Sequence, residues 1–139
     1  MLKEKKTIIF GDGKQTRAFS YIGDIAPVIA NSIINKEARQ QIFNIGADKE
    51  YNVSTLAKAT MDAMGITGEI RYLEARNEVI HAHADHSKAK KVFKMDAAVS
   101  LEAGLKKMAD WAKKTGIRKS ERFKNIEITE KLPPVWLED

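Results

Sequence analysis

Short apolar segments of strand character alternate along this chain with longer segments of helical periodicity. We expect strands at 7–10, 18–22, 41–46 and 69–75 and helices at 25–35, 54–65, 88–93 and 101–116. This alternation favours an α/β fold with about four helices, because strands and amphipathic helices bury their apolar faces against one another. With 139 residues, 43% of them hydrophobic, the chain has material for one small mixed domain with a real core.

Turn and cap residues indicate where these elements begin and end. The turn "GDGKQT" at 11–16 would join the first two strands as a hairpin. We expect Asp24, Ser54 and Ser100 to cap helices at their N-termini, and Gly65 to end the second helix. Four apolar residues recur at helical spacing in the first helix and predict that one face of it is buried: Ile25, Val28, Ile29 and Ile33.

Composition excludes several classes of protein. The chain has no cysteine, so disulfides and thiolate metal sites are excluded. No apolar run reaches the roughly 18 residues of a membrane span, and the first residues lack a signal-like apolar core. We therefore expect a soluble, cytoplasmic protein without a membrane partner. The net charge of +5 comes largely from lysines on the solvated faces of helices, which predicts no nucleic-acid partner.

The six letters "HAHADH" at 81–86 match the H-x-H-x-D-H pattern of metallo-β-lactamase-type hydrolases. Neutral imidazoles and a carboxylate are good zinc ligands, so a metal-dependent hydrolase is one hypothesis. Such a site also needs ligands from distant loops, and all three histidines of the chain lie within these six residues. We expect no metal site, and interpret Asp85 or Ser87 as the residue that opens the short helix.

Three further motifs occur in a fixed order. They are G-x-G-x-Q-x-R-x-F-x-Y-[IV]-x-D at 11–24, F-N-[IL]-G at 43–46 and D-x-S-K-A at 85–89. Together they resemble the C-terminal part of the extended short-chain dehydrogenases, the NAD-dependent nucleotide-sugar epimerases and dehydratases whose type member is UDP-glucose 4-epimerase. The resemblance extends from Ile8 to Gly116. It implies one domain at 1–116 that binds a nucleotide-diphosphate sugar, followed by a polar C-terminal tail at 117–139.

The resemblance also implies which residues contact that ligand. Arg17 would bind the phosphates and Phe19 would lie by the nucleotide, and a planar guanidinium suits phosphate oxygens. Arg76 would be a second phosphate ligand, although its spacing differs by one residue from the family pattern R-x-G-[DE]. Glu78 would accept from a ribose hydroxyl, and Val53 would pack against the base. Two alternatives stay open: Arg17 as an exposed hairpin charge and Val53 as a core residue.

The motifs for cofactor binding and catalysis in this family are missing. No G-x-x-G-x-x-G or G-x-G-x-x-G occurs, so no glycine-rich turn for the NAD pyrophosphate is present. The family's base is a tyrosine followed four residues later by lysine, and none of the three tyrosines has that partner. We therefore assign no catalytic, cofactor-binding or metal-ligating residues. NAD would belong to the full-length enzyme.

The sequence thus predicts the substrate-binding part of an epimerase or dehydratase, as a fragment or the product of a truncated gene. Alone it would be inactive. Its partners would be a UDP-sugar and either a second copy of itself or a chain that supplies the cofactor-binding half, because removing that half leaves apolar surface unpaired. The alternative is an autonomous nucleotide-sugar-binding or regulatory module.

Overall fold

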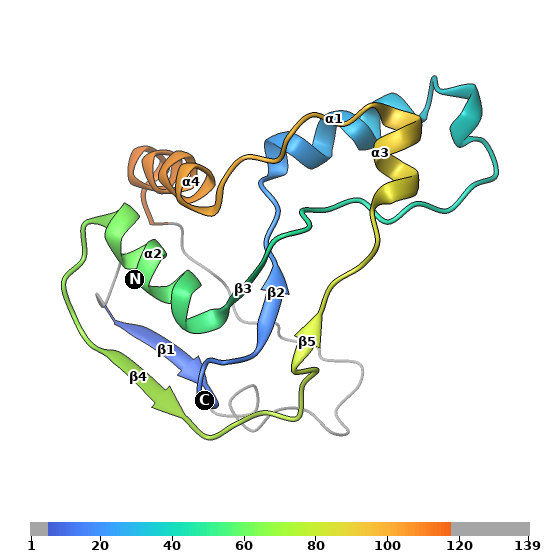
Figure 1. The fold of residues 1–139 in the computed structure, drawn as a ribbon. Helices are drawn as coiled ribbons and strands as arrows, with labels where there is room; N and C mark the ends of the chain where they lie inside the picture. Colours follow the sequence, from blue (N-terminus) through green and yellow to red (C-terminus); the bar gives the residue numbers. More distant parts are fainter. Residues whose placement is uncertain (1–5, 118–139) are drawn as a thin grey trace, which may run out of the picture.

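Five short strands form two separate sheets in the computed structural model, which describes residues 6–117. β1 (Thr7–Phe10) pairs in parallel with β4 (Ile70–Leu73). In the second sheet β2 (Thr16–Ala18) lies between β3 (Glu50–Asn52), which is antiparallel to it, and β5 (His81–Ala82), which is parallel. In Figure 1 β1 and β4 lie side by side below α2, and β2, β3 and β5 lie nearer the centre of the view.

Four α-helices and a short 3-10 helix complete the described chain. They are α1 (Ile22–Ser32), η1 (Lys36–Ala38), α2 (Val53–Met64), α3 (Ser87–Phe93) and α4 (Leu101–Thr115). The small α/β fold with four helices is therefore confirmed. Residues 118–139 lie outside the described range, so the expected polar tail stays a prediction. In the described residues no helix is both long and apolar enough to cross a membrane.

The predicted hairpin between the first two strands is wrong. The turn after β1 leads into the other sheet, and β1 pairs with the distant strand β4 instead. The turn requires glycine at position 13, because Gly13 is buried, has φ of 73° and lies so close to Ser54 that a Cβ would clash with the serine hydroxyl. The Gly13 carbonyl accepts from Ser54 N at 3.1 Å, which holds the turn against the start of α2.

Only some helix ends have the cap residues that the sequence predicted. Ser100 caps α4 as predicted, accepting from Ala103 N at 3.2 Å, and Gly65 ends α2 with φ of 67°. Ser54 is not the cap of α2. That cap is Asn52, whose Oδ1 accepts from Thr55 N at 2.7 Å.

The start of α1 also differs from the prediction. The expected strand at 18–22 ends at Ala18, and α1 begins already at Ile22 with Tyr21 as an N-cap that makes no side-chain hydrogen bond. Asp24 lies in the first turn rather than at the cap. Its Oδ2 accepts instead from Val99 N at 2.8 Å and so joins α1 to the segment before α4.

Residues 41–46 do not form the predicted strand. Their contacts are with α3: Lys88 Nζ donates to the Ile42 carbonyl at 3.0 Å, and the Phe43 and Phe93 rings meet edge-on with centroids 5.0 Å apart. A strand needs a neighbour that takes its backbone hydrogen bonds. Among the described residues no strand lies beside this segment, so it does not form a strand despite its high strand propensity.

The core lies between α2, α4 and the β1–β4 pair, a region that we call the packed half. Its buried side chains are Ile9, Ala57, Met61, Leu101 and Ala109. On the other side of the molecule α1, η1, residues 39–46 and α3 form a separate helical arm (Figure 1). The predicted apolar stripe of α1 is buried at Val28 alone among its strongly apolar positions, and Ile29 and Ile33 are 55% and 82% exposed.

Candidate functional site

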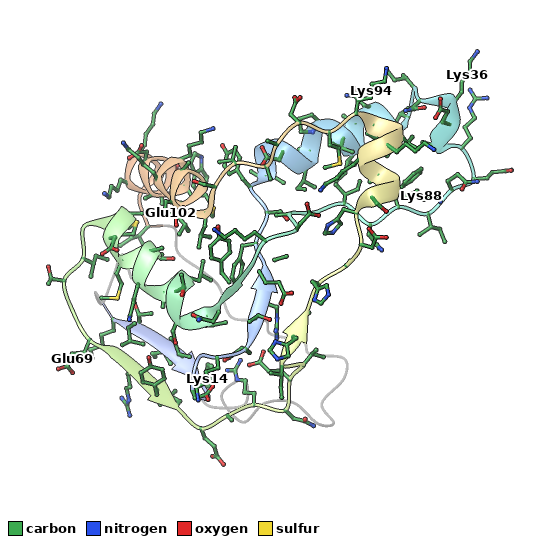
Figure 2. All side chains as sticks on the ribbon, in the orientation of Figure 1. Lys14, Lys36, Glu69, Lys88, Lys94 and Glu102 are labelled. Atoms are coloured by element: carbon green, nitrogen blue, oxygen red, sulfur yellow. The ribbon has the colours of Figure 1, made fainter. Side chains whose placement is uncertain are left out.

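A cavity of about 590 Å³ lies where β1 and β4 end. Its walls come from residues 10–15, which follow β1, and from residues 75–81, which follow β4. Parallel strands end at the same edge of their sheet, and ligands of α/β proteins commonly bind outside that edge. Figure 2 shows Lys14 just beyond the end of β1, and this lysine is one of the wall residues.

Arg17 lies in β2, and its guanidinium is held from three directions. Nη1 donates to the carbonyls of Thr16 at 2.7 Å and Ile80 at 3.2 Å, and Nη2 donates to Glu78 Oε2 at 3.0 Å. Only 27% of the Arg17 side chain is exposed, against 41% for Glu78. The two residues stand 61 positions apart in the chain, and the pairing of β2 with β5 brings them together. Arg17 is therefore not an exposed hairpin charge.

Gln15 is a site residue that the residue-by-residue prediction missed. Its Nε2 donates to the Phe10 carbonyl at 3.0 Å and to Glu78 Oε1 at 3.3 Å. This amide thus fixes the Glu78 carboxylate from the side opposite Arg17. The signal was present, because glutamine is one of the named letters of the motif at 11–24.

Arg76 reaches the same cavity from the segment after β4. Its guanidinium carbon lies 3.4 Å from the centroid of the Phe10 ring, a cation–π contact. Lys14 pairs with Asp12 at 3.2 Å. The Lys14 backbone N–H and then its ammonium lower the pKa of Asp12. The cavity therefore combines an aromatic ring with two cations on its wall, and Arg17 lies behind Glu78.

The other two predicted ligand contacts lie away from this wall. Phe19 is half-buried in the extended segment between β2 and α1. Val53 begins α2, is also half-buried, and its N–H donates to the Gln15 carbonyl at 3.1 Å. The structure thus places Arg76 and Glu78 on one cavity wall and pairs Arg17 with Glu78. The ligand-binding roles of all five residues stay predictions.

The first two histidines of "HAHADH" are joined in one chain of contacts through Thr16 and Glu50. His81 Nδ1 lies 2.8 Å from the Thr16 hydroxyl, and His83 Nδ1 lies 3.1 Å from Glu50 Oε1. The Thr16 hydroxyl also donates to Glu50 Oε2 at 2.5 Å. In the part of the chain that the structure describes, no three His, Cys, Asp or Glu residues are grouped as metal ligands would be.

The third histidine, His86, belongs to the helical arm. It is 6% exposed at the start of α3, and its Nδ1 lies 3.1 Å from Asp48 Oδ1. Gly46 faces its ring so closely that a Cβ there would lie 2.9 Å from Nε2. Asp48 also pairs with Lys90, and the Lys90 ammonium followed by His86 lowers the pKa of Asp48. This cluster links the loop after residue 46 to α3.

Comparison with known proteins assigns these features to a family, although no family model matches the chain. The sequence is 35% identical over 114 residues to a putative UDP-glucose 4-epimerase of Methanocaldococcus jannaschii, a match that covers 81% of this chain and 36% of that protein. It is 34% identical over 128 residues to a UDP-glucuronate 4-epimerase of Thermodesulfobacterium geofontis, covering 91% of this chain and 38% of the relative.

Solved structures agree with these relatives. The UDP-glucuronic acid 4-epimerase of Bacillus cereus, solved with UDP-glucuronic acid and NAD, matches 81% of this chain and 37% of its own, with a TM-score of 0.72 and 28% identity. An epimerase of Methanothermobacter thermautotrophicus has a TM-score of 0.75 at 21% identity, which supports the fold alone; that match covers 80% of this chain and 34% of the epimerase.

These matches define the class of protein that the chain resembles: it is homologous to part of the extended short-chain dehydrogenases, the NAD-dependent nucleotide-sugar epimerases and their relatives. Within that class it corresponds to a C-terminal piece of enzymes such as the UDP-glucose and UDP-glucuronate 4-epimerases. The chain spans between a third and two fifths of the length of the relatives described above.

Proposed function

We propose that this chain is the substrate-binding part of a nucleotide-sugar epimerase and holds the nucleoside diphosphate end of a UDP-sugar. The observation that carries the proposal is the cavity at the ends of β1 and β4, with Arg76 and Lys14 on its wall and Arg17 next to it. Guanidinium groups bind phosphate oxygens through paired N–H donors. Relatives with this fold include enzymes solved with UDP-glucuronic acid bound.

The assigned roles follow from the chemistry of each side chain. Arg17 and Arg76 would bind the two phosphates, and the Glu78 carboxylate would accept from ribose hydroxyls. Phe19 and Val53 would contact the nucleoside. None of these groups performs hydride transfer, so we propose that this chain contributes recognition and that NAD and the catalytic base belong to the remainder of the enzyme.

We further propose that the helical arm is the surface on which that remainder docks. The arm exposes Ile33, Ile34 and Ile42 at 82%, 79% and 88%. Contiguous exposed apolar side chains mark interaction surfaces, because burying them releases ordered water and lowers the free energy. Residues 41–46 form no strand in the described part of the chain, so a strand of the docked part could pair with them.

UDP titrated into isotope-labelled protein tests the binding proposal. Amide signals of residues 10–17 and 76–81 should shift in a saturable way, and Arg17→Gln should weaken the affinity by at least roughly tenfold, because a charged hydrogen bond is lost. Arg71→Gln is the matched control, since Arg71 is exposed on β4 outside the cavity wall. Equal losses in both variants would contradict a specific site at Arg17.

The autonomous binding module remains the second candidate. It requires full affinity for a UDP-sugar in this chain alone, with no gain when a cofactor-binding half is added. If the chain is instead the substrate-binding part of an enzyme, its affinity for a UDP-sugar should be low alone and should rise when the cofactor-binding half is added. The reason is that the ligand would be enclosed by two walls, of which this chain supplies one. Isothermal titration with and without the separately expressed NAD-binding half of a relative distinguishes the two.

A further inference from the structure

Four polar side chains share one face of the sheet formed by β2, β3 and β5. Successive residues of a strand point to opposite faces, so residues two apart point to the same one. Thr16 of β2 lies opposite both Asn52 of β3 and His81 of β5. Glu50 is two residues from Asn52, and His83, just after β5, is two residues from His81. The register therefore gathers Thr16, Glu50, His81 and His83 on one face.

The hydrogen bonds within this group determine which ring nitrogen of each histidine carries a proton. An ionised carboxylate only accepts, so the single hydroxyl proton of Thr16 points to Glu50 Oε2 at 2.5 Å. The Thr16 oxygen then accepts from His81 Nδ1 at 2.8 Å, and this nitrogen must carry a proton. His83 Nδ1 likewise donates to Glu50 Oε1 at 3.1 Å. In the neutral form of both rings the free lone pair is therefore on Nε2.

We propose that His81 and His83 together bind one Zn²⁺ ion, or a transition-metal dication of similar chemistry, through their Nε2 atoms. Imidazole nitrogen is a good ligand for these cations. Metal-binding histidines generally donate their other ring N–H to a carboxylate or a similar acceptor, which orients the ring and makes it a stronger ligand. Glu50 has this role directly for His83 and through the Thr16 hydroxyl for His81. The inference does not depend on the proposed function.

The spacing and exposure of the two rings suit a shared ion. Residues two apart on a strand are separated by about 6.6 Å, and two imidazoles that lean towards each other can both reach an ion at about 2.0–2.1 Å. The His83 side chain is 61% exposed, and His81 is exposed as well, so an ion and its remaining water ligands have access. Because both rings are anchored on β2 and β3, the ion would hold β5 more firmly against the sheet.

This pair is a different site from the one that the six-letter pattern "HAHADH" suggests. The Asp85 carboxylate accepts from the Ser87 backbone N–H at 2.9 Å and from the Ser87 hydroxyl at 3.0 Å, and so belongs to the start of α3. His86 is buried in the helical arm. The proposed ligands are therefore His81 and His83 alone, with water in the other coordination positions.

Calorimetric titration of Zn²⁺ into four proteins tests the inference: the unchanged chain, His83→Ala, Glu50→Gln and Asp85→Asn. The buffer is at about pH 7.5, above the usual histidine pKa of about 6.5, and contains excess Mg²⁺, which prefers oxygen ligands. The unchanged chain should bind one ion. Glu50→Gln should weaken the affinity roughly tenfold, the cost of losing an outer-shell carboxylate, and His83→Ala should weaken it further. Asp85→Asn, the matched control, should change it less than about twofold.

Two measurements on the same proteins complete the test. Long-range ¹H–¹⁵N spectra of the metal-free chain should show the proton on Nδ1 in both His81 and His83, and Zn²⁺ should shift the Nε2 signals of both rings. Zn²⁺ should also raise the thermal unfolding midpoint of the unchanged chain and of Asp85→Asn but not of His83→Ala, because an ion that binds the folded state stabilises it.

Four results would overturn the proposed site. One is the absence of saturable Zn²⁺ binding to the unchanged chain. Equal affinity in all four proteins would show an adventitious ion only. A proton on Nε2 rather than Nδ1 in either neutral ring would contradict the assigned ligand atoms. A loss in Asp85→Asn as large as that in His83→Ala would assign the ion to the six-letter pattern instead of the histidine pair.

Discussion

The packed half and the helical arm carry similar apolar patterns, but their apolar side chains differ in how far they are buried. In the packed half α2 packs against both α4 and β1, and Met61 and Leu101 are each 8% exposed. In the arm α1 packs against α3, and Ile33 of its stripe is 82% exposed. An amphipathic pattern specifies that a face is to be buried but does not specify the partner. This difference is the reason why we propose the arm as a docking surface.

The largest expected contrast between the two regions is in stability. Ile9→Ala in the packed half should lower the free energy of unfolding by about 3 kcal/mol, because Ile9 is 2% exposed and its loss leaves a cavity. Ile33→Ala in the arm should change it by less than about 0.5 kcal/mol. Urea denaturation followed by circular dichroism measures both. Similar losses would mean that the arm is buried in solution, for example by self-association.

A second contrast concerns association. Ile33→Asp should weaken self-association or docking of a cofactor-binding half by about 2 kcal/mol, the free energy of burying one isoleucine side chain. Ile117→Asp is the control, since Ile117 is 53% exposed after the end of α4. Sedimentation velocity over a range of concentrations gives the dissociation constants. If the chain stays monomeric at all concentrations and does not bind the added half, the arm is not an interaction surface.

The smallest expected effect is the pH dependence of the arm. The pKa of Asp48 is lowered by Lys90 and then His86, so its carboxylate stabilises the folded state above the aspartate pKa of the unfolded chain, about 3.9. This contribution is lost as the pH falls through the lower pKa of the folded state. Because Asp48 is largely exposed, the contribution is small.

Asp48→Asn should therefore flatten the fall of the urea midpoint as the pH is lowered below about 3.9. The control is Asp62→Asn, an exposed aspartate in α2 of the packed half. If both variants keep the steep acid dependence of the unchanged chain, the Asp48 cluster does not stabilise the arm.

The candidate site shows which of its features sequence motifs could predict and which they could not. Arg17 and Glu78 were predicted from separate motifs, and the structure brings them within 3.0 Å of each other. Their contact itself could not be predicted, because it depends on β2 pairing with β5 across the chain. Gln15 was overlooked for a related reason: its role is to hold Glu78, and that role exists only when the two segments meet.

Local features of the fold were determined by the sequence alone. The α2 stop at Gly65 and the Ser100 cap depend on backbone conformations and hydrogen bonds within a few residues. Strand pairing depends on distant partners, so the tertiary structure decided that β1 joins β4 rather than β2 and left 41–46 without a neighbour. A strand is stable only when another strand takes its backbone hydrogen bonds, and no local pattern states which segment that will be.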